Sequence, residues 1–378
     1  MNPTSRIYLD NNATTPLDPR VLAAMEIDAT WPLNPSSTHF FGRHARGLLS
    51  QARATVAAAF DVPPEEIIFT SGGTESLQLL ICGTLAYHHS GHIISSNLEH
   101  ACVDATLKHC EEKGYEVTYL APQAKGAPTP SSVAAAIRPT TRLIVLTAVN
   151  SETGVKLDIA SIASLAQKAR IPLILDGVAL LGKEPVTLPP GVLGIGFSAH
   201  KIHGPQGVGF AIARTGLPLL PQLLGGGQEQ GRRSGTENLA GILGLAKAIS
   251  LLAEEGPPAY TRMAQLQTYF ETTLAAHFPD LQINGSSPRI ANTSNLAFPG
   301  YEGEVLLAQL DQRGIAASHG SACSSGALEP SRILLNMGYS RARAASSLRF
   351  SFSRMTTQKE IDTALAALKT LLIHLQPI

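Results

Sequence analysis

The sequence predicts an α/β protein, with a large domain built on a mostly parallel sheet flanked by helices and a smaller α+β domain. Short apolar runs typical of buried strands alternate with helical patterns between residues 67 and 213. A chain of 378 residues is long enough for two domains. Gly256-Pro257-Pro258 interrupts the helical pattern, and beyond it strand and helix signals are mixed.

The composition limits the classes of partner and the compartment. Lys+Arg and Asp+Glu are equal at 29 each, which argues against electrostatic binding of nucleic acid or a membrane surface. The N-terminal residues MNPTSRIYLDNN lack the apolar core of a signal peptide, so we expect a cytoplasmic protein. Four cysteines are too few for a disulfide framework, and their spacing with the nearby histidines fits no common zinc site.

The first sixty residues read as a polar loop followed by two helices. Residues 1–16 contain the turn-forming run DNNATTP, and Pro19 precedes a helical pattern over residues 20–29. A second amphipathic helix is predicted over residues 43–60.

Strand and helix patterns then alternate, which predicts parallel strands joined by crossover helices. The predicted strands are residues 67–70, 92–96, 116–120, 143–147 and 172–176. The predicted helices between them are residues 75–88, 101–113, 131–137 and 158–170.

Lys201 lies between two further apolar runs, residues 192–199 and 207–213, with a turn over residues 200–205. One interpretation lets the amine extend along the apolar surface to solvent. In the other, partial burial lowers the amine's pKa and makes it a nucleophile for an aldehyde cofactor such as pyridoxal 5'-phosphate (PLP). Other residues of the chain must decide between them.

The rest of the chain predicts a glycine-rich loop and the smaller domain. Helices are predicted over residues 237–255, 260–278, 302–313 and 358–374, and strands near residue 283 and over 295–298 and 347–351. We therefore expect a large cofactor-binding domain over residues 17–256. Residues 1–16 and 257–378 would form the small domain, with a mobile cysteine loop at about 318–331.

Three candidate groups follow predicted strands, at the sheet edge where open α/β folds bind ligands. The loop SGGTES, with Gly73 and Thr74, opens a helix and is suited to an anion, although a simple capped turn is the alternative. Asp176 either pairs with the pyridine nitrogen of PLP or caps a turn. His100 is a candidate for proton transfer, or an ordinary loop histidine.

Three further candidates lie nearer the C-terminus. The loop GGGQEQGRRSGT, which ends at Thr236, either binds a phosphate or is a flexible surface loop. Cys323 lies among small residues in GSACSSGALEPS, which favours a reactive thiol over an inert one. Arg349 lies on an apolar strand, where its anionic partner is either a substrate carboxylate or a structural acid.

Taken together, these motifs resemble the cysteine desulfurase family of PLP enzymes, in the class V aminotransferase group of fold-type I. The resemblance runs nearly end to end and keeps the family's motif order. It rests on the sequences YLDNNATTPLDPRV, SGGTES, LEH, SAHKIHGP, GGGQEQGRRSGTEN, GSACSSGALEPS and SSLRFS.

The resemblance implies a homodimer with PLP bound to Lys201 and a Schiff base between them. It implies a phosphate site made of Gly73, Thr74, Ser198 and His200, with Thr236 supplied by the other subunit. His100 would stack on the ring and move protons, and Asp176 would face the pyridine nitrogen.

The resemblance also implies the substrate, L-cysteine, and the route of its sulfur. Arg349, with Asn11 and Asn150, would bind the substrate. Cys323 would take the sulfur as a persulfide, leaving alanine, and pass it to a protein acceptor such as an iron–sulfur scaffold or a tRNA-thiolation protein. The long cysteine loop resembles that of one subgroup of the family.

Two positions depart from the family pattern. The family has Asn where this chain has Ser151, and Gln where it has Ala179, and both usual residues contact the phenolic oxygen of PLP. We therefore expect a working desulfurase with an altered cofactor environment. Two alternatives stay open from the sequence: another PLP enzyme of the same fold, such as a selenocysteine lyase, or a degenerate member that acts as a binding partner.

Overall fold

A seven-stranded sheet forms the centre of the computed structural model, which describes residues 6–26, 31–122, 126–286, 288–320 and 329–375. The strand order is β2-β8-β7-β6-β5-β3-β4, and within this sheet β8 alone runs against its neighbours. The predicted mostly parallel sheet is therefore confirmed. Its strands are β2 (Ile67–Thr70), β3 (Gly91–Ser96), β4 (Tyr115–Leu120), β5 (Thr141–Thr147), β6 (Leu173–Asp176), β7 (Val192–Ser198) and β8 (Gly209–Ala213).

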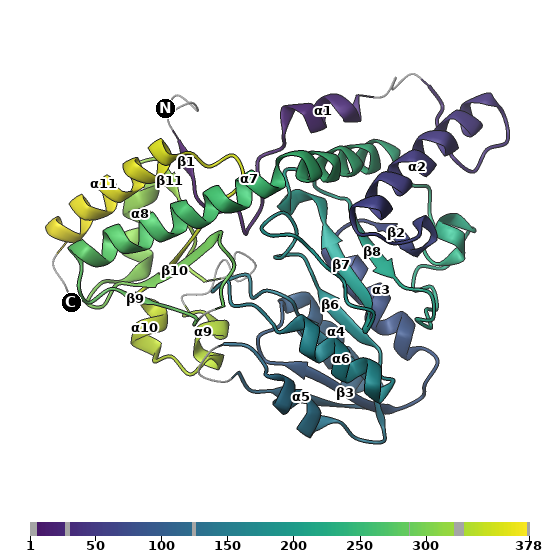
Figure 1. Cartoon of the computed structure of the whole chain (residues 1–378), viewed down its shortest axis with the longest axis horizontal. Helices are drawn as coiled ribbons and strands as arrows, with labels where there is room; N and C mark the ends of the chain where they lie inside the picture. Colours follow the sequence, from purple (N-terminus) through teal and green to yellow (C-terminus); the bar gives the residue numbers. More distant parts are fainter. Residues whose placement is uncertain (1–5, 27–30, 123–125, 287, 321–328, 376–378) are drawn as a thin grey trace.

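Helices cover both faces of this sheet (Figure 1). Strand side chains alternate, so Ile67 and Phe69 enter one core while Ile68 enters the other. The first core takes residues from α2 (Phe40–Ala59), α5 (Pro130–Ala136), α6 (Ile159–Ala169) and the first half of α7 (Leu239–His277). The second takes residues from α3 (Gly73–Leu85) and α4 (Ala101–Glu112).

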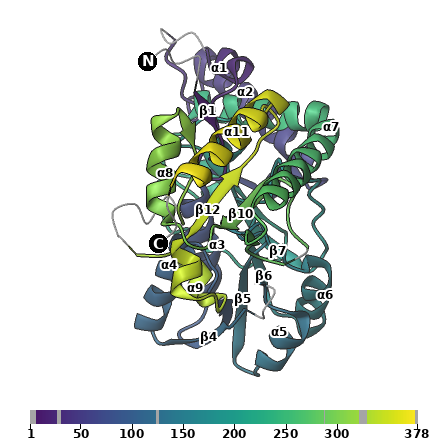
Figure 2. The ribbon, with the colours of Figure 1, turned by 90° about the vertical axis from the view of Figure 1, so that its left-hand side faces the viewer.

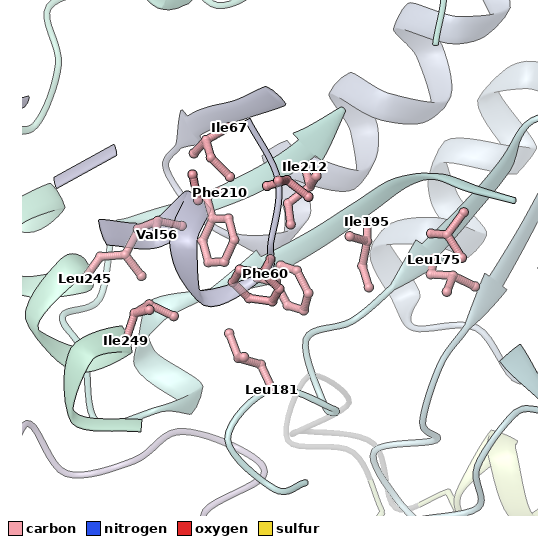
Figure 3. Packing of buried hydrophobic residues seen from close by; sticks show 14 of the residues in the cluster. Val56, Phe60, Ile67, Leu175, Leu181, Ile195, Phe210, Ile212, Leu245 and Ile249 are labelled. Atoms are coloured by element: carbon pink, nitrogen blue, oxygen red, sulfur yellow. The ribbon is translucent and has the colours of Figure 1, made fainter. Parts of the chain in front are cut away.

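Three aromatic rings pack together in the first core, and Figure 3 shows two of them, Phe60 and Phe210, among its apolar side chains. Phe60, Phe197 and Phe210 are 4.9 to 5.5 Å apart between ring centroids. Phe197 and Phe210 face each other across the β7–β8 pair. Their packing holds in place the two strands that flank Lys201.

The smaller part of the chain has its own sheet and its own core. Strands β9 (Gln282–Ile283), β10 (Thr293–Ala297) and β12 (Ser347–Ser351) pair in the order β12-β10-β9. Helices α7, α8 (Gly303–Gln312) and α11 (Gln358–His374) lie around this sheet (Figure 2). Phe270, Phe350 and Phe352 are fully buried there.

The N-terminus crosses into this smaller part. Strand β1 (Ile7–Tyr8), predicted as a loop, pairs in parallel with β11 (Ile315–Ala316), and Leu9 is buried in the smaller core. Two-residue strands carry too few side chains for a period-2 pattern to be recognised. We propose, on the two cores, the domain division expected from the sequence, with residues 17–256 in one domain and 1–16 with 257–378 in the other.

The predicted helix break at Gly256-Pro257-Pro258 is wrong, because α7 is one helix of 39 residues that runs through both prolines (Figure 1). A proline removes the hydrogen bond to the carbonyl four residues earlier. Those carbonyls belong to Ala253 and Glu254, which are exposed and can bind water instead. The buried stripe of α7, meanwhile, continues on the opposite side.

The other differences are short elements. Helix α1 (Pro19–Met25) begins one residue before the predicted start and ends at Met25, so the predicted continuation to residue 29 is wrong: Glu26 already has non-helical backbone angles. Two short helices, α9 (Arg332–Asn336) and α10 (Arg341–Ala345), were not predicted. In the described part of the chain no helix has both the length and the apolar character needed to cross a membrane.

Candidate active site

Five parallel strands of the large sheet, β2, β3, β5, β6 and β7, end at one edge beside a cavity of about 1010 Å³. The opposite wall comes from α8, β11 and the segment 329–333 of the smaller part. Most of the predicted site residues line this cavity: Asn11, Gly73, Thr74, His100, Asn150, Asp176, Ser198, His200, Lys201 and Arg349.

Lys201 ends the short 3₁₀ turn Ala199–Lys201 that follows β7, and it is half-buried. Its Nζ donates to the backbone carbonyls of Asn12 and of Ala13, the latter at 2.8 Å. The N-terminal loop thus holds the amine at the cavity wall, which supports the buried interpretation over the solvent-exposed one.

A second lysine, which the sequence analysis missed, lies behind the first. Lys183 is buried and its Nζ donates to the backbone carbonyl of Lys201 at 2.7 Å. Burial, and next the positive charge of Lys201, lower the pKa of Lys183 to about 7. Its position, beside a turn and next to Glu184 in sequence, gave no signal of burial.

Asp176 is buried at the end of β6, where one carboxylate oxygen accepts the Val178 N–H at 2.9 Å. Burial raises the pKa of this carboxyl, while that hydrogen bond and the charges of His100 and Lys201 act in the opposite direction. A buried carboxylate in this place needs a positive partner, and a protonated ring nitrogen would supply one.

His100 precedes α4 and is the N-cap of that helix. Its Nδ1 accepts the backbone N–H of Cys102 at 3.2 Å and lies 3.0 Å from the Cys102 Sγ. The thiol of Cys102 also lines the cavity, and the sequence analysis assigned it no role.

The predicted phosphate loop opens α3, whose N-terminus has no side-chain cap among the described residues. Gly73 is required there, because a Cβ would lie 2.7 Å from the Val178 side chain. Ser198 lies beside this N-terminus, with its hydroxyl 3.7 Å from where a Cβ on Gly72 would be. The unpaired N–H groups and the helix dipole suit an anion.

His200 and Thr236 occupy different places. His200 lines the cavity and bonds Thr14 through Nδ1 at 3.1 Å. Burial, and next the charge of Lys201, lower its pKa to about 4, so the imidazole is neutral at pH 7. Thr236 is exposed and lines a separate small hollow with Ser71 and Arg233, so this chain does not bring it to the cavity.

Arg349 extends from β12 into the cavity wall and is 2% exposed. It pairs with Asp10 at 2.6 Å and donates to the Ser151 carbonyl at 3.3 Å. Its buried Nε has no hydrogen-bond partner among the described residues. The structure therefore gives the guanidinium a structural acid, Asp10, and a substrate carboxylate as a further partner stays a prediction.

Asn11 and Asn150 line the cavity but bond mainly within the protein. Asn11 donates to the carbonyls of Tyr8 and Ser351. The Asn150 Oδ1 accepts from the N–H groups of Glu152 and Thr153 and from the Thr153 hydroxyl, which fixes the turn after β5.

Ser151 and Ala179, where the sequence departs from the family pattern, are both half-buried in the cavity wall. The Ser151 backbone carbonyl accepts from Arg349 and from the Asn12 side chain at 2.9 Å. The turn that carries Ser151 is therefore held in place from two sides, whatever side chain it bears.

Cys323 lies outside the described residues. Gly320 and Glu329, the described residues nearest to it in sequence, both line the cavity. Among the described residues no group of three or more histidines, cysteines or acids is arranged to hold a metal ion.

Known proteins resemble this chain over nearly its whole length. The family model described as Aminotransferase class-V matches residues 7–364. A cysteine desulfurase from Trichormus azollae is 38% identical, with 99% of this chain and 94% of that protein covered. The solved structure of a NifS-like protein has a TM-score of 0.91, 32% identity, and coverage of 98% of this chain and 100% of its own. A structure described as SspA in complex with cysteine has a TM-score of 0.82 and 31% identity, covering 93% and 100%.

We predict that Lys183 makes stability depend on pH above neutrality. Its folded pKa is depressed, so between pH 7 and 9 the unfolded chain holds a proton that the folded chain releases, and stability rises with pH. From pH 7 to 9 this group should add about 2 kcal/mol to the free energy of unfolding. Chemical denaturation of the wild type and of Lys183→Met at pH 7 and pH 9 measures this contribution, which the variant should lack.

Lys359→Met, which removes an exposed lysine on α11, is the control and should keep the wild-type difference between the two pH values. A Lys183→Met protein with the same pH difference as the wild type would contradict the assignment.

Proposed function

Because the chain belongs to the aminotransferase class-V family and is a PLP-dependent cysteine desulfurase, we propose that the cavity residues described above carry out its reaction. The expected family and its fold-type I architecture are confirmed. The observation that carries the assignment of residues is the convergence of Lys201, Asp176, His100 and Arg349 on one cavity.

The cavity fits PLP at three points. The uncapped N-terminus of α3, with Thr74 in its first turn and Ser198 beside it, suits the phosphate, and neutral His200 lines the same cavity. Lys201 would bind the aldehyde carbon, and the buried carboxylate of Asp176 would pair with the ring nitrogen. Bound there, PLP would supply an electron sink for bonds broken at the substrate's Cα and Cβ.

Arg349 would bind the carboxylate of L-cysteine. Asp10 pairs with one side of the guanidinium, and Arg349 lies in the cavity wall. Because that pair restricts the side chain, the guanidinium is preorganised for a planar carboxylate. Asn11 and Asn150 hold the loops on either side of this position.

Cys323 would receive the sulfur. Its thiolate attacks the substrate's sulfur, so an S–S bond forms while the Cβ–S bond breaks and leaves its electron pair with the carbon fragment. Protonation of that fragment, for which His100 and Lys201 in the cavity wall are the candidate groups, would give alanine. The persulfide on Cys323 then passes its outer sulfur to a thiol of an acceptor protein.

Of the described cysteines, Cys82, Cys102 and Cys110 are free thiols, which supports a cytoplasmic location.

We expect Cys323→Ala to abolish the release of both alanine and sulfide from L-cysteine, while the absorbance band of bound PLP persists. The reason is that the variant binds cofactor and substrate but has no thiol to accept the sulfur. Alanine is measured by chromatography and sulfide colorimetrically in the presence of a reducing thiol.

Cys82→Ala serves as the control, because that thiol lies on α3 away from the cavity, and it should retain wild-type turnover. Wild-type alanine formation by Cys323→Ala would rule out the persulfide route. A wild type without the PLP band would rule out the assignment of Lys201.

The active form we propose is a homodimer. Thr236 lies in the glycine-rich loop, outside the cavity of its own chain, and Arg233 of that loop pairs with Glu75 of α3 at 2.7 Å. The loop is thus held beside the phosphate site yet directed to the surface, where a second subunit would meet it. Exposed Leu223 and Leu224 precede it.

Light scattering should therefore give the mass of two chains, and Thr236→Ala should weaken PLP retention without changing that mass. Arg313→Ala, at an exposed position on the other part of the molecule, is a control that should change neither. A monomer that binds PLP and turns over L-cysteine at full rate would contradict the proposal.

With Ser151 and Ala179 in place of the amide side chains Asn and Gln, the PLP absorbance band should titrate with a higher pKa than it would with the amides. Hydrogen-bond donors to the phenolic oxygen stabilise its negative charge, which is fully developed only in the deprotonated form. Restoring amides with Ser151→Asn and Ala179→Gln should therefore lower that pKa by about one unit, since bonds to charged groups contribute about 1.5 to 3 kcal/mol.

Absorbance titration of the wild type and the double variant measures this shift. Ser151→Thr keeps the hydroxyl and should titrate like the wild type. An unchanged titration in the double variant would show that neither position faces the phenolic oxygen.

A further inference from the structure

Cys102 is the second residue of α4 and brings a thiol into the cavity beside His100. Two of its atoms approach the same ring nitrogen. The backbone N lies 3.2 Å and the Sγ 3.0 Å from the Nδ1 of His100. The Thr74 side chain, in the first turn of α3, lies close enough to the thiol to lower its pKa as a donor.

These contacts determine which ring nitrogen of neutral His100 carries the proton. A backbone N–H can only donate, so its bond to Nδ1, long at 3.2 Å, favours the proton on Nε2, and the thiol would be the second donor that holds this form. Burial, and next the charge of Asp176, raise the pKa of the Cys102 thiol to about 12, so this group keeps its proton at physiological pH. It is a hydrogen-bond donor and an unreactive one.

We propose that Cys102 is a positioning residue whose thiol donates to Nδ1 of His100 and accepts from Thr74, holding His100 in the form protonated on Nε2. The proposal rests on the proposed function, in which His100 moves protons. It adds a direct link from the loop that would bind the phosphate to the group that would move protons.

The contacts at Nδ1 limit which nitrogen of His100 can transfer a proton. With Nδ1 engaged by two donors, Nε2 is the nitrogen that exchanges protons with the substrate. A second proton can enter the ring only at Nδ1, which would break the N-cap of α4 and the contact with the thiol. His100 therefore starts each cycle as a donor through Nε2.

The test compares Cys102→Ala with Cys102→Ser, whose hydroxyl can make the same two bonds. Nitrogen-15 spectra of histidine-labelled protein, with and without PLP, report which ring nitrogen is protonated. The His100→Gln spectrum identifies the His100 signal among the 12 histidines. We expect the wild type and Cys102→Ser to be protonated on Nε2, and Cys102→Ala to populate the form protonated on Nδ1.

The pH dependence of turnover is the second readout. In Cys102→Ala the acid limb of the kcat profile should move to higher pH by about half to one unit, and kcat at pH 7 should fall about two- to tenfold with little change in KM. Cys102→Ser should restore both. Cys82→Ala, which removes a thiol outside the cavity, should leave both unchanged.

Unchanged nitrogen spectra and an unchanged acid limb in Cys102→Ala would overturn the proposal, as would a Cys102→Ser protein that behaves like Cys102→Ala. Circular dichroism melting of each variant excludes loss of folding as the cause. If the wild type formed no alanine, the proposed function would fail, whereas the spectra of the PLP-free protein would still decide the role of Cys102.

Discussion

The parallel direction of five strands is the constraint on which the site depends. Parallel strands must all end at one edge of the sheet, and the chain must leave each of them there through a loop or turn. Gly73, His100, Ser151, Asp176 and Lys201 come from five such ends, although more than a hundred residues separate the first from the last. The sheet supplies no guanidinium at this edge. That group comes from β12 in the smaller part, which explains why the cavity needs both parts of the chain.

Buried charge then determines which ligands the cavity favours. Lys201 comes to the cavity wall from the large sheet and Arg349 from the smaller part, and these two cations are placed to meet anionic groups of a ligand. The buried carboxyls of Asp176, Glu99 and Glu152 lie in the same wall, and burial raises the pKa of all three, that of Glu99 to about 8. Burial thus reduces their tendency to repel a ligand that carries a phosphate and a carboxylate.

Sequence patterns report local structure, and contacts between distant segments lie beyond them. Runs such as IPLILD and GVLGIGFS have the length and composition of buried strands, so the strand ends and the residues that follow them were predictable. Contacts between distant segments leave no such pattern, which is why β1 with β11, and Asp10 with Arg349, were missed. The predicted break in α7 is wrong for another reason. The free-energy cost of a proline within a helix depends on whether the carbonyl that loses its hydrogen bond is exposed to water. The contact of Cys102 with His100 was missed because a cysteine two residues after a histidine forms no recognisable sequence motif.

Backbone hydrogen bonds hold the turn at Ser151, the position at which the sequence resemblance predicts a departure from the family pattern. The loop after β5 is fixed by the Asn150 Oδ1, which accepts three hydrogen bonds, and by the Ser151 backbone carbonyl, which accepts from Arg349 and Asn12. None of these bonds uses the Ser151 side chain. The backbone therefore keeps Arg349 and the N-terminal loop in register while the side chain is free to differ. A change of that side chain therefore leaves intact the hydrogen bonds that join this turn to Arg349 and Asn12.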